Sequence, residues 1–156
     1  MRFLRRGRGV SPLPLLAAAV FVLAMAGTAD ATDSFVVVVN SSVAGTTMHR
    51  ADLAAVFLKK AVRWGDGSPA NPVDQSGTSP TRKSFSEDVL HMPVMAVVQY
   101  WGKQLASMAA SALRPPIVKA SDDEVLVYVA KTSGAVGYVS SGTTPPPGVK
   151  VITIID

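Results

Sequence analysis

The sequence predicts an α/β fold in which helices flank one mixed β-sheet. Two continuous runs, Phe35–Val39 and Ala135–Val139, have the apolar composition of strands that are buried on both faces. Segments with apolar residues at helical spacing lie between these runs. Strands that alternate with helices along a chain indicate layers of helix and sheet around one core.

The rest of the chain predicts the remaining elements. Between about His49 and Lys60, apolar residues recur at helical spacing, with Asp52 early and lysines late, as the helix dipole favours. Ser121–Glu124 matches the capping box S-x-x-E, so this acidic cluster is interpreted as a helix start rather than a metal site. The other expected elements are a strand at 70–73, helices at 79–90 and from Pro93 to Leu105, a helix at 122–131 and a final strand at 149–155.

Residues 1–31 have the composition of a secretory signal peptide. A basic start precedes the apolar run Leu13–Ala26, and Ala29-Asp30-Ala31 provides the small residues of a cleavage site. The remaining residues, 32–156, are enough for one domain with a hydrophobic core. The apolar run is short for a membrane-spanning helix. We therefore expect a periplasmic or secreted protein without stable membrane insertion, rather than a membrane-anchored one.

The composition argues against several classes of function. Residues 1–31 contain four of the fifteen basic residues and one of the eleven acidic residues, so the rest of the chain has a net charge of +1. This balance does not indicate a nucleic-acid-binding surface. With no cysteine and only His49 and His91, we expect no disulfide, no metal site and no cofactor. No G-x-S-x-G nucleophile motif occurs, so an enzyme is not expected.

The segment Asp74–Ser84 predicts an anion-binding turn. A glycine-containing turn that opens a helix leaves backbone N–H groups unpaired, and the helix dipole adds partial positive charge there. Ser76 and Thr78 add hydroxyl donors, and Gly77 lets a ligand approach the backbone. Arg82, in the first helical turn, is the expected charged partner of the anion.

The sequence adds two expected neighbours to this turn and also allows an alternative interpretation of it. Ligands collect at strand ends in α/β sheets, so Asn40 and Ser41, which follow the first strand, are expected as neighbours of the turn. The same turn is also consistent with an ordinary loop in which Ser79 caps the helix and Pro80 opens it. The sequence alone leaves both interpretations open.

Four motifs in a fixed order carry a resemblance to a known family. They are Val36–Asn40, Asp52–Lys60 followed by Trp64, Asp74–Thr78, and Ser133–Val139. In this order the chain resembles the second lobe of the periplasmic phosphate-binding proteins of ABC importers, which have the type 2 periplasmic-binding fold. The resemblance covers nearly all of residues 32–156 and implies a single lobe of that fold. It also implies that Ser76, Gly77 and Thr78 bind phosphate.

The chain departs from the family pattern at two positions beside the turn. Pro72 stands near the position of a family arginine, and Gln75 replaces a family glycine. Two hypotheses therefore stay open. The first is an exported, non-catalytic phosphate- or oxyanion-binding module related to phosphate import, which binds the anion weakly or with a protein partner that completes the cleft. The second is a periplasmic protein-interaction module that retains the fold without the ligand.

Overall fold

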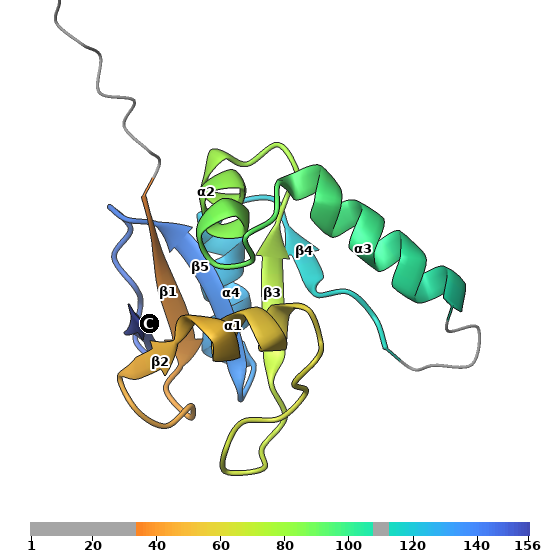
Figure 1. Cartoon of the computed structure of the whole chain (residues 1–156). Helices are drawn as coiled ribbons and strands as arrows, with labels where there is room; N and C mark the ends of the chain where they lie inside the picture. Colours follow the sequence, from red (N-terminus) through yellow and green to blue (C-terminus); the bar gives the residue numbers. More distant parts are fainter. Residues whose placement is uncertain (1–33, 108–112) are drawn as a thin grey trace, which may run out of the picture.

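A six-stranded mixed sheet with the strand order β2-β6-β1-β5-β3-β4 forms the centre of the computed structural model (Figure 1). The structure describes residues 34–107 and 113–156, so the expected signal peptide lies outside the described residues. The strands are β1 (Phe35–Asn40), β2 (Thr47–His49), β3 (Asn71–Gln75), β4 (Ile117–Lys119), β5 (Ala135–Ser140) and β6 (Val149–Ile155). The helices are α1 (Arg50–Phe57), α2 (Pro80–Asp88), α3 (Val94–Ser107) and α4 (Asp122–Lys131).

The directions of the strands decide which loops meet. β1 is antiparallel to both of its neighbours, β5 and β6, whereas β3 is parallel to β5 and to β4. Phe35, at the start of β1, therefore lies opposite Ser140, at the end of β5. The carboxyl end of β3 lies at this same end of the sheet, and the carboxyl end of β1 lies at the other.

Helices cover both faces of the sheet. Figure 1 shows α1 and α2 in front of the sheet and α4 behind it. On β1, Val37 and Val39 belong to the core under α1 and α2, whereas Val38 packs with residues of α4. This arrangement explains the continuous apolar run, because successive side chains of a strand point to opposite faces.

Gly137 allows α4 to lie close to the sheet. A Cβ atom at this position would lie 2.7 Å from a methyl group of Val73 and 2.8 Å from a methyl group of Val125. Both distances are shorter than a carbon–carbon contact permits. The glycine within the apolar run of β5 is therefore a requirement of helix–sheet packing.

The sequence predicted most of these elements. The expected α/β architecture with one mixed sheet is confirmed, and α4 and β6 have the expected boundaries. Apolar and aromatic side chains of both the strands and the helices are buried, each at most 8% exposed: Val37, Phe57, Trp101, Val136 and Tyr138. The short strands β2 and β4 were not predicted. His49, expected within the first helix, instead ends β2 and stands at the N-cap of α1.

Candidate functional site

The turn Ser76–Ser79 connects the end of β3 to the start of α2. The Ser76 N–H donates to the Lys119 carbonyl at 3.0 Å, which ties the turn to the end of β4. The Ser79 N–H donates to the Ser76 carbonyl at 2.9 Å and closes the turn. Gly77 and Thr78 at its tip are exposed. The strand end and the helix start thus hold an exposed loop in a defined shape.

Several donors of this turn are free to meet a ligand. In the ranges 34–107 and 113–156, the backbone N–H groups of Gly77 and Thr78 donate to no protein acceptor. The hydroxyl groups of Ser76 and Thr78 lie 3.1 Å apart and bond only to each other. A Cβ atom placed on Gly77 would have a methyl group of Val94 as its nearest neighbour, at 4.0 Å, so the backbone is open on this side. This arrangement suits an oxyanion.

The Ser79 side chain has the capping role that the alternative interpretation predicted. Its hydroxyl accepts a hydrogen bond from the Arg82 N–H at 3.2 Å and donates to Gln75 Oε1 at 2.6 Å. Pro80 occupies the first helical position, where a missing N–H has no consequence. The cap occupies Ser79 but not Gly77 or Thr78. The two interpretations of the segment therefore apply to different residues of it.

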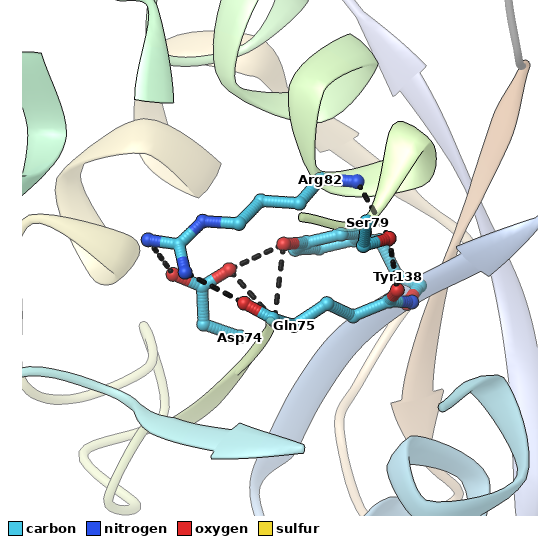
Figure 2. Close-up of polar contacts among 5 residues, drawn as sticks. All are labelled: Asp74, Gln75, Ser79, Arg82 and Tyr138. Atoms are coloured by element: carbon cyan, nitrogen blue, oxygen red, sulfur yellow. Dashed lines mark hydrogen bonds and ion pairs between the residues drawn. The ribbon is translucent and has the colours of Figure 1, made fainter. Parts of the chain in front are cut away.

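Arg82 belongs to a buried polar cluster beneath the turn, which consists of Asp74, Gln75, Arg82 and Tyr138 (Figure 2). The guanidinium contacts the Asp74 carboxylate at 2.9 Å and donates to the Gln75 carbonyl at 2.6 Å. Arg82 is 7% exposed, and its Nε is a buried atom without a hydrogen-bond partner. Asp74 therefore compensates the charge of Arg82, which the sequence analysis had assigned to an anion.

Tyr138 completes the cluster from β5. Its hydroxyl donates to the Asp74 carboxylate and accepts from the Gln75 N–H at 3.2 Å. Its ring stacks on Phe85 of α2, with ring centroids 4.0 Å apart. Burial, followed by the neighbouring Asp74 charge, raises the pKa of Tyr138, so this side chain stays a neutral donor. Burial also raises the pKa of Asp74, although Arg82 and Tyr138 act in the opposite direction.

The Gln75 side chain extends the cluster toward α4. Its amide donates to the Asp122 carboxylate at 2.7 Å and to the Tyr138 carbonyl at 2.9 Å. Asp122 also accepts bonds from the Ser140 N–H at 3.1 Å and the Thr143 hydroxyl at 3.2 Å. Burial alone would raise the pKa of Asp122, but these hydrogen bonds outweigh it and lower the pKa. Sequence reasoning found neither this role of Gln75 nor the contribution of Tyr138.

Asn40 and Ser41 lie at the other end of the sheet and are not neighbours of the turn. The Asn40 amide donates to the Val129 carbonyl at 2.8 Å, near the end of α4, and the Ser41 N–H donates to the Gly148 carbonyl at 2.9 Å. The expectation required β1 and β3 to end at the same edge. Because β1 is antiparallel to β5 while β3 is parallel to it, the two strands end at opposite edges.

Within residues 34–107 and 113–156, no group of three or more His, Asp or Glu side chains is placed to hold a metal ion. His49 and His91 are both exposed. None of the described helices is long and apolar enough to cross a membrane.

The fold is similar to those of several solved phosphate-binding proteins. An ABC-type phosphate transport receptor from Vibrio cholerae matches 78% of this chain with 20% identity and a TM-score of 0.57. PstS from Borrelia burgdorferi matches 78% with 15% identity and a TM-score of 0.58. A phosphate ABC transporter substrate-binding protein from Clostridium perfringens, solved with bound phosphate, matches 78% with 14% identity and a TM-score of 0.58.

These similarities concern the fold and cover part of each relative. The chain spans 46%, 47% and 45% of the three proteins, respectively. No known family model and no curated protein matches the sequence. The structure therefore has a partial periplasmic-binding-protein fold, as the motif order had indicated.

Proposed function

We propose that this chain is an exported, non-catalytic oxyanion-binding module that takes phosphate or a similar anion at the Ser76–Thr78 turn. One observation carries the proposal: the exposed N–H groups of Gly77 and Thr78 have no protein acceptor, and they lie directly before α2. Helix N-termini with free N–H groups attract anions through both hydrogen bonds and the helix dipole. The similarity to proteins described as phosphate receptors supports phosphate as the first anion to test.

The expected affinity is modest. A helix terminus contributes only about 0.3–2 kcal/mol to the binding of a neighbouring anion. The turn is exposed, so salt screens the interaction. Arg82 contributes no uncompensated charge, because Asp74 pairs with it. We expect a phosphate Kd in the high micromolar to millimolar range, about 4–6 kcal/mol of binding free energy, unless a protein partner covers the turn.

Export is part of the proposal. The basic start, the apolar run and the small-residue site in residues 1–31 support cleavage after Ala31 and a mature chain of residues 32–156. Mass spectrometry of the periplasmic or secreted protein tests this expectation. An intact Met1 terminus in the exported form would contradict it.

A protein-interaction module is the second candidate, and one observation favours it. Arg82 and the side chain of Gln75, which flank the turn, are both occupied by internal contacts. Calorimetric titration with phosphate, sulfate and molybdate separates the two candidates. Binding of any of these anions supports the first. If none binds at concentrations up to tens of millimolar, the interaction module becomes the better account.

A further inference from the structure

A pocket lies at the opposite end of β3 from the Ser76–Thr78 turn. It has a volume of about 340 Å³. Asn71 and Pro72, at the start of β3, line it, and so do Lys59, Arg114 and other residues. Among the described residues that line the pocket, none is acidic. Residues 108–112, which come before Arg114 in the chain and are not described, also contain no acidic residue.

Lys59 adopts a backbone conformation that favours glycine. Its φ is 55°, in the left-handed region. The Lys59 N–H donates to the Val56 carbonyl at 3.1 Å, and the Lys60 N–H donates to the Ala55 carbonyl at 2.8 Å. These two bonds form the Schellman motif that ends many helices, in which the left-handed position is usually glycine. A lysine at this position is unfavourable for folding, and residues held in this way often serve a ligand.

The two cations of this pocket have no internal counterion. Neither Lys59 nor Arg114 forms an ion pair with any described residue. The Lys59 side chain is half-buried, and this burial lowers the pKa of its ammonium group. A partly desolvated cation without a partner is unfavourable unless an anion joins it. Arg82, in contrast, is buried together with its counterion, the carboxylate of Asp74.

We propose that this pocket binds a small organic phosphate monoester, with Lys59 and Arg114 contacting the phosphate. Two cations that line one pocket match a dianionic group, and guanidinium pairs well with phosphate oxygens. The pocket falls at the lower end of the size range of small-molecule sites. Val62 and Ile117 supply apolar surface for the organic part of the ligand. This site is independent of the one proposed at the turn.

The proposal is tested by titrating the full chain with phenyl phosphate as the probe and comparing Lys59→Gly, Arg114→Gln and Gly77→Val. Lys59→Gly places glycine where the backbone favours it, so we expect a higher Tm together with phenyl phosphate affinity weakened by at least about tenfold. Arg114→Gln should weaken the affinity by a similar factor without changing Tm. Gly77→Val, which alters only the turn, should leave unchanged the part of phenyl phosphate binding that is lost in Lys59→Gly and Arg114→Gln.

Three outcomes would overturn the proposal. They are no binding of phenyl phosphate by the wild type at about ten millimolar, unchanged affinity in Lys59→Gly, or loss of affinity in Gly77→Val alone. Inorganic phosphate, titrated in parallel, reports on the turn. If the affinity for inorganic phosphate falls in Gly77→Val and stays unchanged in Lys59→Gly, the site proposed at the turn is supported, whatever the result for the pocket.

Discussion

Two polar regions of this protein are neighbours in sequence and differ in whether their charges and hydrogen-bonding groups have partners within the protein. The buried cluster of Asp74, Gln75, Arg82 and Tyr138 supplies its own charge balance and most of its own hydrogen bonds. The exposed turn Ser76–Thr78 leaves two backbone N–H groups without a protein acceptor. A group that the fold already uses is not available to a ligand, so the functional proposal belongs to the turn.

Arg82 has a structural role in the buried cluster instead of the anion-binding role expected from the sequence. Within the first turn of a helix behind a glycine loop, an arginine fits an anion-binding interpretation. In the structure, burying Asp74 without a cation would be unfavourable, and Arg82 meets that need. The positive potential at the turn then comes from the backbone and the dipole of α2. Mutations in the cluster should therefore affect stability, whereas mutations in the turn should affect binding.

The largest effect is expected for Arg82→Gln. This change leaves the Asp74 carboxylate buried without its cation, which destabilises the fold by about 3–5 kcal/mol. Urea unfolding measures the loss. The double variant Asp74→Asn/Arg82→Gln serves as the control and should recover part of the stability, because no charge is then buried alone. A loss below about 1 kcal/mol in the single variant would mean that the cluster is not structural.

Tyr138→Phe should have the next largest effect. It keeps the ring that stacks on Phe85 but removes the hydroxyl that donates to Asp74 and accepts from the Gln75 N–H. The Gln75 N–H still donates to Asp74 Oδ1 at 2.8 Å and Arg82 still pairs with Asp74, so the loss is that of a buried hydrogen bond to a charged group, about 1.5–3 kcal/mol. Thermal and urea unfolding should show this loss, while the affinity for phosphate stays unchanged. Weaker phosphate binding in a fully folded Tyr138→Phe would show that the cluster takes part in binding.

Ser79→Ala tests the cap between the two regions. The change removes the acceptor for the Arg82 N–H and the donor to Gln75 Oε1. Loss of an N-cap of this kind costs about 0.5–2 kcal/mol. Unfolding measurements should show a decrease in this range with Pro80 still in place. A neutral result would indicate that water or a neighbouring group replaces the cap.

The acid dependence of stability separates Asp122 from Asp74. Hydrogen bonds lower the pKa of Asp122 from the ordinary value of 3.8, so its contribution is present above that pH and is lost as the pH falls through the lowered pKa. Burial raises the pKa of Asp74, which gives the opposite sign: its contribution is present below 3.8 and is lost as the pH rises through the raised pKa.

The Asp122 contribution is expected to be the smallest of these effects. Unfolding followed between about pH 2 and 6 should show a weaker loss of stability toward acid in Asp122→Asn than in the wild type. Identical pH profiles for the two proteins would show that the carboxylate of Asp122 makes no net contribution to stability in acid.

The sequence predicted the parts of this fold that depend on local pattern. The apolar run of β1 and the capping box of α4 each predict their element from only a few residues. The structure has the capping bond, in which the Ser121 hydroxyl accepts a hydrogen bond from the Glu124 N–H. The three-residue strands β2 and β4 have no such pattern, because each is defined by the strand it pairs with. The antiparallel direction of β1, which removes Asn40 and Ser41 from the turn, likewise depends on tertiary structure.

The candidate site shows the same division. The glycine turn before a helix is a local signal, and the structure has that turn where the sequence predicted it. The contacts of Tyr138 with Asp74 and Gln75 join residues 64 and 63 positions apart, and no local pattern reveals them. Which polar groups remain free can therefore be decided only from the folded chain.

The most direct test of the central claim is calorimetric titration of phosphate into the wild type and Gly77→Val at low ionic strength. A Cβ atom at this exposed position would have a methyl group of Val94 as its nearest neighbour, at 4.0 Å, so we expect the variant to fold with unchanged Tm. We predict that the wild type binds phosphate with a Kd in the high micromolar to millimolar range, about 4–6 kcal/mol, and that Gly77→Val abolishes binding at the turn by blocking the approach to the backbone. Phosphate binding that persists at full strength in a folded Gly77→Val would contradict the assignment of the site to the Ser76–Thr78 turn.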